Sequence, residues 1–235
     1  MIAFRSFLFV AAFYVWSATL AICMTPLFIA PHRWIGAALG VWSRGNFVLL
    51  RVLCDVKVEI RGLEHAPKGP GLVAAKHQCM FDTMSLWHVL PGACFVLKKE
   101  LILIPFFGWY SLKGKMIVVD REAHAKALRK LVRDAKDRLA DGRQIVIFPE
   151  GTRTPPGETG DYKPGIAALY RELGVPVVPL ATNSGVHWPA HGFIRKPGTI
   201  VFEFLPPIPA GLKRAEFMRE LEGRIEPASA ALLPL

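Results

Sequence analysis

Cysteine is scarce in this sequence, and the four cysteines, at positions 23, 54, 79 and 94, form no CxxC pair. Scattered cysteines of this kind make neither the dense framework of a disulfide-stapled domain nor the paired ligands of a zinc finger. The chain also lacks a GxSxG elbow and a P-loop, which removes the usual signatures of serine lipases and nucleotide hydrolases. We therefore expect free thiols, as on a reducing cytosolic face, with no metal site and no bound cofactor.

Acidic residues are few: 19 Asp and Glu stand against 29 Lys and Arg, which gives a net charge of +10. A basic surface predicts an anionic partner, such as nucleic acid, acidic lipid headgroups or a phosphorylated substrate. The sequence has no zinc-finger or RNP pattern, and its N-terminus is strongly apolar, which is unusual for a nucleic-acid-binding protein. We expect lipid, and no nucleic acid, as the partner.

Charge is absent from residues 6–31, a run long enough to cross about 30 Å of hydrocarbon as a helix. A signal peptide is the alternative, because Arg5 precedes the run and residues 19–21 make a weak small-x-small cleavage site. The run nevertheless continues to Phe28, which is longer than a normal signal-peptide core. The sequence predicts a membrane segment, either spanning the bilayer or lying in one leaflet.

Residues 32–54 predict a second helix, in which Arg33, Arg44 and Arg51 interrupt an apolar pattern. The pattern is typical of an interfacial helix, and Trp34 and Trp42 suit the headgroup region. A core helix with three solvated arginines is the alternative. We expect residues 1–54 to form a hydrophobic two-helix membrane anchor. The arginines beyond the apolar run predict that the globular part lies on the cytoplasmic face of the inner membrane.

Residues 55–235 read as one α/β domain, in which β-rich runs alternate with helical patterns. The predicted helices cover residues 122–140, the segment after Pro164, and residues 214–225. Seven runs are strand candidates: VKVEIRG, GLVAAKH, CFVLKK, MIVVD, QIVIF, VPVVPLA and TIVFEFL. This alternation predicts a mixed, largely parallel sheet flanked by helices.

His77 follows one predicted strand, and Asp82 comes five residues later in KHQCMFD. In a continuous helix the two side chains would point about 140° apart, so they can meet only if the chain turns between them. A helix that opens at Asp82 would supply this turn. The pair could then abstract a proton from a hydroxyl, which predicts acyl transfer to a substrate hydroxyl. An incidental histidine beside a helix-capping aspartate is the alternative.

A second charged motif, FPEGTRT at residues 148–154, directly follows the strand candidate QIVIF. A loop at this position lies at the carboxyl edge of the sheet, where α/β proteins bind ligands. Arg153 is suited to a phosphate, and Glu150 could bond a hydroxyl or orient the arginine. A solvated turn with a surface Glu–Arg pair is the alternative. Arg121, at the end of GWYSLKGKMIVVDR, offers another cation at the same edge.

In order and content, KHQCMFD, GWYSLKGKMIVVDR, FPEGTRT and VPVVPLA resemble the four blocks of the glycerolipid acyltransferase family. The resemblance is strongest to bacterial 1-acyl-sn-glycerol-3-phosphate acyltransferases with an HxxxxD motif, and it spans about residues 56–205. It implies that His77 deprotonates the acceptor hydroxyl and that Asp82 orients the imidazole. It also implies a glycerol-phosphate site made of Arg121, Glu150, Gly151, Thr152 and Arg153. Lys76 and Cys79 replace the usual Asn and Ser, which leaves the hydrogen bonds of those positions open.

The resemblance implies transfer of a fatty acyl group to the sn-2 hydroxyl of 1-acyl-sn-glycerol 3-phosphate, which forms phosphatidic acid in phospholipid biosynthesis. The expected partners are membrane lipids, lysophosphatidic acid, and acyl-CoA or acyl carrier protein as the donor. Another lysolipid acceptor, such as lyso-ornithine lipid, would use the same hydroxyl chemistry. A non-catalytic membrane lipid-binding protein with this fold is the alternative from a different class.

Overall fold

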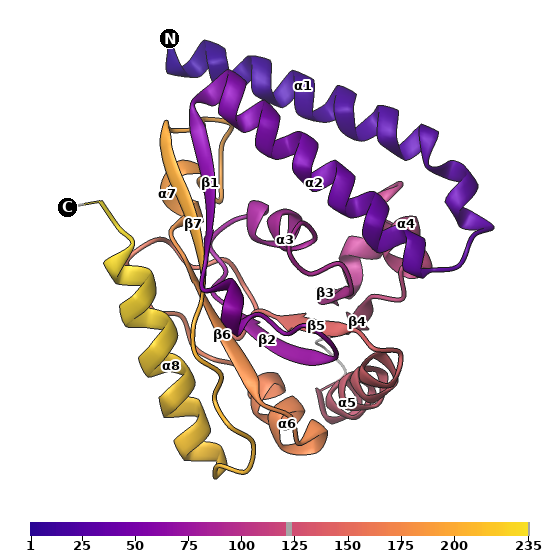
Figure 1. Cartoon of the computed structure of the whole chain (residues 1–235), viewed down its shortest axis with the longest axis vertical. Coiled ribbons are helices and arrows are strands. Elements are labelled where there is room, and N and C mark those ends of the chain that lie inside the picture. Colours follow the sequence, from indigo (N-terminus) through magenta and orange to yellow (C-terminus); the bar gives the residue numbers. More distant parts are fainter. Residues whose placement is uncertain (121–123, 235) are drawn as a thin grey trace.

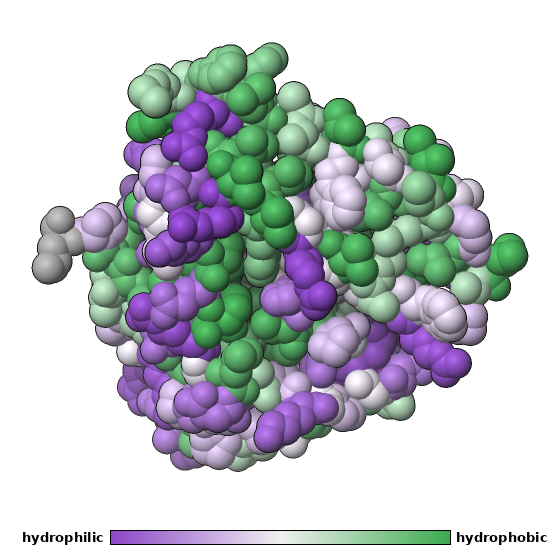
Figure 2. All heavy atoms as spheres, turned by 45° about the horizontal axis from the view of Figure 1, so that its top comes forward, coloured by the Kyte–Doolittle hydropathy of each residue, from purple (hydrophilic) through white to green (hydrophobic). Residues whose placement is uncertain are grey.

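Two long antiparallel helices lie along one side of an α/β domain (Figure 1). The computed structural model describes residues 1–120 and 124–234. Helix α1 spans Ile2–Cys23 and α2 spans Arg33–Cys54, with a 3-10 turn, η1, at Thr25–Phe28 between them. Both helices are long and apolar enough to cross a bilayer by length and composition. Figure 2 shows hydrophobic side chains gathered on the face that these helices form.

Hydrogen bonds fix α1 against α2. The Arg5 guanidinium donates to the Leu53 carbonyl at 2.6 Å, and the Trp16 indole donates to the Trp42 carbonyl at 3.2 Å. A Cβ atom at Gly45 would lie 2.3 Å from the Trp16 ring, so only glycine leaves room for this indole. The two helices therefore form one rigid hairpin.

Helix α1 also contacts the globular domain near both of its ends. Near the N-terminus, the Phe9 ring packs edge-on against Trp188 at 5.4 Å, and the Arg195 amide donates to the Ser6 hydroxyl at 2.8 Å. Near the other end, the Tyr110 hydroxyl donates to the Ala21 carbonyl at 2.8 Å. The hairpin is thus part of the folded body, with α2 between α1 and the sheet (Figure 1).

The sheet has seven strands in the order β1-β7-β6-β2-β5-β3-β4. All neighbouring pairs are parallel except β6 and β7, which are antiparallel. The strands are β1 Val56–Arg61, β2 Gly71–Ala75, β3 Ala93–Lys98, β4 Ile117–Val119, β5 Gln144–Ile147, β6 Val177–Thr182 and β7 Gly198–Phe204. Every predicted strand is present, and the prediction of a mixed, largely parallel sheet is confirmed.

Helices cover both faces of the sheet (Figure 1). One face carries α5 His124–Ala140, α6 Pro164–Leu173 and α8 Arg214–Ala231, while α2 and α3 Phe81–Leu86 lie on the other. The smaller elements are η2 Leu63–His65, η3 Lys99–Leu103, α4 Phe107–Lys113 and α7 Ser184–His187. The last predicted helix was too short: α8 continues past residue 225 and through Pro227, and its final turns stay packed through the buried Ser229.

Candidate active site

The chain turns between His77 and Asp82 and brings the two side chains together. Strand β2 ends at Ala75 and α3 begins at Phe81, so Asp82 lies in the first turn of the helix. The Nδ1 atom of His77 lies 3.0 Å from Oδ2 of Asp82. A turn at this point is what the five-residue spacing requires if the pair is to meet, since the two side chains would point apart on a continuous helix.

The His77 ring is held on one side and open at its other nitrogen. It stacks on Phe148 with ring centroids 4.0 Å apart and planes at 19°. Its side chain keeps 16% of its surface exposed. Within residues 1–120 and 124–234, Nε2 makes no hydrogen bond. With Nδ1 directed at a carboxylate, Nε2 is the atom that can accept a proton from an incoming hydroxyl.

Asp82 is buried and surrounded by donors. Its Oδ2 accepts from the backbone amides of Gln78 at 2.7 Å and Cys79 at 2.8 Å, in addition to the His77 contact. Its Oδ1 accepts a short hydrogen bond from the Ser184 hydroxyl. These bonds offset the cost of burying a carboxylate and fix its orientation toward the imidazole.

Ser184 is a site residue that the sequence did not reveal. It begins α7, directly after β6, and β6 is the parallel neighbour of β2. The predicted block VPVVPLA forms most of β6 and so places this serine at the same sheet edge. The only signal in the sequence was a polar residue shortly after a buried strand.

Cys79 lies between the dyad residues without acting as a nucleophile. The thiol is buried and contacts the Ser184 hydroxyl at 3.4 Å. Burial, and then the nearby Asp82 carboxylate, raise the pKa of this thiol well above its usual value. A protonated thiol is a poor nucleophile. The family resemblance left the hydrogen bonds of position 79 open. One of them runs from the Cys79 backbone amide to Oδ2 of Asp82.

The loop after β5 meets His77 because β2 and β5 are parallel neighbours whose carboxyl ends share one edge. The Thr154 amide donates to the His77 carbonyl at 2.8 Å, and the His77 amide donates to Glu150 at 3.4 Å. Gly151 has a φ of +67°, a left-handed conformation that glycine adopts without strain. The FPEGTRT loop therefore lies against the backbone of His77.

Glu150 points into the protein and not toward Arg153. Its carboxylate is buried and lies 3.4 Å from the Lys76 ammonium. Burial raises the pKa of this carboxyl above its usual value, although Lys76 acts in the opposite direction. Among the described residues no hydrogen bond joins Glu150 to Arg153, so the suggested orienting contact is not formed.

Lys76 is the centre of a buried ionic cluster that the sequence did not predict. Its ammonium donates to both carboxylate oxygens of Glu226, at 2.9 and 2.7 Å, and to the Glu158 carbonyl at 3.0 Å. The Tyr162 hydroxyl donates to the same Glu226 at 2.9 Å. The cluster joins the end of β2 to the loop after β5 and to helix α8.

Thr152 and Arg153 are exposed at this edge. One arginine nitrogen donates to the Ala190 carbonyl at 3.1 Å, which leaves most of the guanidinium donors for a ligand. Arg121 lies outside the described residues. Among those residues, no group of three or more His, Cys, Asp or Glu side chains is placed to hold a metal ion.

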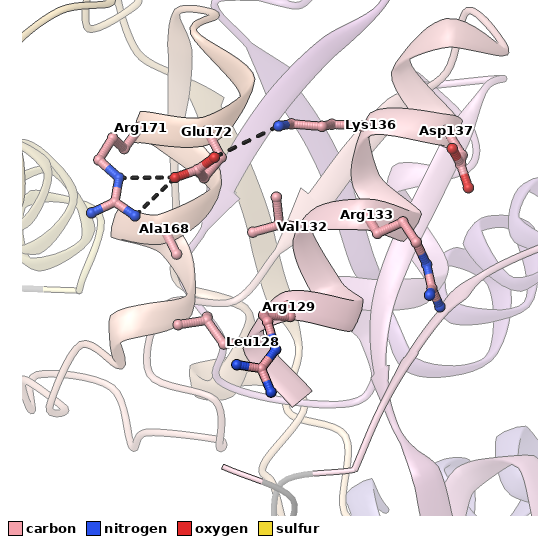
Figure 3. Close-up of a pocket in the computed structure, with 9 residues that line it drawn as sticks. All are labelled: Leu128, Arg129, Val132, Arg133, Lys136, Asp137, Ala168, Arg171 and Glu172. Carbon is pink, nitrogen blue, oxygen red and sulfur yellow. Dashed lines mark hydrogen bonds and ion pairs between the residues drawn. The ribbon is translucent and has the colours of Figure 1, made fainter. Parts of the chain in front are cut away.

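A separate groove lies between α5 and α6 (Figure 3). Its volume is about 470 Å³, and Leu128, Val132 and Ala168 supply its apolar lining. Glu172 there is paired with Arg171 at 2.8 Å and with Lys136 at 3.6 Å. Among the residues that the structure describes, the groove is lined by no histidine, serine or cysteine, so it offers no counterpart of the His77–Asp82 pair.

The comparison with known families decides the class of protein. Residues 57–183 match the family model described as Acyltransferase. This chain belongs to the acyltransferase family. The matched region contains His77, Asp82 and the FPEGTRT loop, whereas α8 and Glu226 lie beyond it.

Individual acyltransferases are similar over most of the chain. A 1-acyl-sn-glycerol-3-phosphate acyltransferase of Pseudomonas aeruginosa is 36% identical over 92% of this chain and 83% of its own length. The 1-acyl-sn-glycerol-3-phosphate acyltransferase alpha of Bos taurus is 30% identical over 70% of this chain and 58% of its own length. The crystal structure of the lysophosphatidic acid acyltransferase PlsC from Thermotoga maritima has the same fold. It aligns with a TM-score of 0.81 at 21% identity, covering 99% of this chain and 98% of that one.

Proposed function

We propose that this acyltransferase transfers a fatty acyl group to the sn-2 hydroxyl of 1-acyl-sn-glycerol 3-phosphate and forms phosphatidic acid. The observation that carries the proposal is the His77–Asp82 pair, held at 3.0 Å with Nε2 open. The Ser184 hydroxyl and the Cys79 thiol beside the pair are buried and directed at Oδ1 of Asp82, not at Nε2 of His77, so the acceptor hydroxyl itself attacks. The names of the relatives support this acceptor.

The proposed chemistry is a single acyl transfer. Nε2 of His77 takes the proton of the acceptor hydroxyl as its oxygen attacks the thioester carbonyl of the donor. The tetrahedral intermediate collapses, the C–S bond breaks, and the thiolate leaves with the proton that His77 returns. Asp82 stabilises the transient imidazolium and holds the ring in place. The products are the ester and a free thiol.

We assign recognition of the phosphate to the exposed side of the same edge. Arg153 presents a guanidinium suited to bidentate phosphate binding, with Gly151, Thr152 and Arg121 as further members of the site. Glu150 also belongs to the site, and its burial beside the His77 amide supports a role in holding the loop. The donor is acyl-CoA or acyl carrier protein, both acidic, which the net charge of +10 suits.

We propose that α1 and α2 lie in one leaflet of the inner membrane, with the active site on the cytoplasmic face. Helix α1 contacts the globular domain near both ends, through Ser6 and Ala21. An orientation across the bilayer would carry this domain into the hydrocarbon, where its charged surface is costly. A hairpin lying in the plane of the leaflet avoids this cost.

The test is to supply the purified protein in detergent micelles with radiolabelled acyl donor and a panel of lysolipids. Lysophosphatidic acid should be acylated fastest, and the His77→Ala variant should be inactive while keeping its circular dichroism spectrum. Faster acylation of lyso-ornithine lipid would instead support that alternative acceptor. Turnover retained by His77→Ala would contradict the catalytic assignment.

A further inference from the structure

The segment that connects β3 to β4 exposes an unusual amount of apolar surface. From Leu101 to Leu112 no residue is charged. Leu103 is 80% exposed, and four more large side chains are between 44% and 54% exposed. We call these five residues the α4 patch: Leu103, Ile104, Phe106, Trp109 and Leu112. A soluble surface exposes such side chains singly, so a cluster of this kind indicates an interaction site.

The α4 patch is held in a fixed shape. The Gly108 amide donates to the Ile104 carbonyl at 2.8 Å. A Cβ atom at Gly108 would lie 1.9 Å from the Ile102 carbonyl oxygen, so the turn closes tightly only with glycine here. Phe106 adopts a φ of +61°, which is unfavourable for a bulky residue. The backbone thus holds these apolar side chains outward at a cost in conformational free energy at Phe106.

The α4 patch continues the apolar surface of the helix hairpin. The Tyr110 ring lies 4.8 Å from the Phe28 ring, and its hydroxyl bonds the Ala21 carbonyl. Ile22 and Ile29, at the turn between α1 and α2, are also exposed. Figure 1 shows α4 beside this end of the hairpin.

The charges at both ends of the segment favour an anionic membrane surface. Lys98 and Lys99 precede it, and Lys113 and Lys115 follow it. Three of these ammonium groups form exposed surface ion pairs, Lys98 with Glu100, Lys99 with Asp120 and Lys115 with Asp141, so four cations face three acids at this edge. Lysines beside an apolar segment are attracted to acidic headgroups. An exposed tryptophan such as Trp109 suits the boundary between headgroups and hydrocarbon.

We propose that the α4 patch is a third membrane-inserting element, which enters the same leaflet as α1 and α2. Its occupant is the headgroup and upper hydrocarbon region of a bilayer that contains anionic lipid. The proposal rests on the proposed membrane association of the hairpin. It adds a contact on the acyltransferase domain itself, far along the sequence from the anchor.

The experiment places one nitroxide label at a time in a Cys23→Ser background, because Cys23 is the exposed cysteine and the other three are buried. The labels are attached through Leu103→Cys in the α4 patch, Phe7→Cys on exposed α1, and Arg133→Cys on α5 as the water-facing control. Collision rates with oxygen and with a water-soluble nickel chelate are measured on vesicles of phosphatidylethanolamine and phosphatidylglycerol.

On these vesicles the ratio of oxygen to nickel collisions should rise several-fold at positions 103 and 7 and stay unchanged at position 133. A ratio that rises at 7 but not at 103 would overturn the α4 proposal alone. Unchanged ratios at both positions would overturn the membrane association as well. Spin–spin broadening at 103 would identify a second copy of the chain as the occupant and would also reject the proposal.

A binding measurement provides an independent test. Leu103→Asp should weaken partitioning into these vesicles about tenfold or more, because a large apolar side chain no longer enters the lipid. The matched control is Leu63→Asp, since Leu63 is a half-exposed leucine on η2. Equal partitioning of the two variants would contradict the proposed insertion.

Discussion

The Asp82 carboxylate contacts Nδ1 of His77 and also accepts from the backbone amides of Gln78 and Cys79. An amide in its place would direct an N–H group at one of those donors. We expect Asp82→Asn to lower kcat about 10²–10⁴-fold with the fold retained. Ser184→Ala removes a single donor to the same carboxylate and should cost less. Initial rates in micelles check both variants, and wild-type kcat for Asp82→Asn would remove this residue from the mechanism.

We predict that the Cys79 thiol is not required for acyltransferase activity. Burial and the Asp82 carboxylate raise its pKa, so the thiol stays neutral and unreactive as the pH rises through the physiological range. Cys79→Ser keeps a hydrogen-bonding group of similar size and should keep most of the activity. N-ethylmaleimide should leave the Cys23→Ser variant active, because the three remaining cysteines are buried. Inactivation of that protein by the reagent would argue for an essential thiol.

Arg153 should affect binding of the acceptor and not the chemical step. Losing charge-assisted bonds to a phosphate should raise KM for lysophosphatidic acid about tenfold or more, with kcat little changed. Arg171→Ala, an exposed arginine on α6, is the matched control and should leave both constants unchanged. Steady-state kinetics with varied acceptor measures the effect. An unaltered KM in Arg153→Ala would rule out the phosphate contact.

At the scale of elements, α8 supplies a buried carboxylate to the end of β2. Removing Glu226 leaves the buried Lys76 ammonium with less compensation, and broken buried pairs cost about 3 kcal/mol or more. Glu226→Ala should therefore lower the melting temperature in detergent well beyond Glu220→Gln. Glu220 is an exposed residue of the same helix that pairs with Arg224, and its change should cost no more than about 0.5 kcal/mol.

A coupling experiment separates this ion pair from a general defect of the helix. If Lys76 and Glu226 interact directly, the loss caused by Lys76→Met and the loss caused by Glu226→Ala should not add in the double variant. Additive losses would mean that the two residues stabilise the protein independently.

The helices and strands could be predicted from local sequence pattern, whereas the distant residues that contact the site could not. Seven apolar runs predicted the strands, and the five-residue spacing required a turn after His77 for His77 and Asp82 to meet. Ser184 and Glu226 join the site from segments more than 100 positions away along the chain, and no periodicity links them to His77. Lys76 could be recognised in the sequence as a departure from the family pattern. Its buried pairing with Glu226 depends on how α8 packs against the sheet, and the local sequence pattern does not determine that packing.

For the whole molecule, the excess of positive charge predicts a salt-dependent attraction to acidic membranes. Binding to vesicles of phosphatidylglycerol should weaken as salt rises, because screening shortens the Debye length to about 10 Å at 0.1 M. Binding to phosphatidylcholine vesicles should be weaker and insensitive to salt, since only apolar insertion contributes there. Co-sedimentation measures both. Salt-independent binding to the acidic vesicles would mean that the basic residues do not face the membrane.

The passage from α2 into the sheet fixes the helix hairpin relative to the α/β domain. A single residue, Asp55, separates Cys54 from Val56, and its carbonyl accepts from the Gly198 amide at 3.2 Å. There is no flexible tether at this junction, so the α/β domain cannot swivel on the two helices. If the hairpin lies in one leaflet as we propose, the height of the His77 ring relative to the bilayer is a built-in dimension of the protein, and an acceptor lysolipid has to present its hydroxyl at that height.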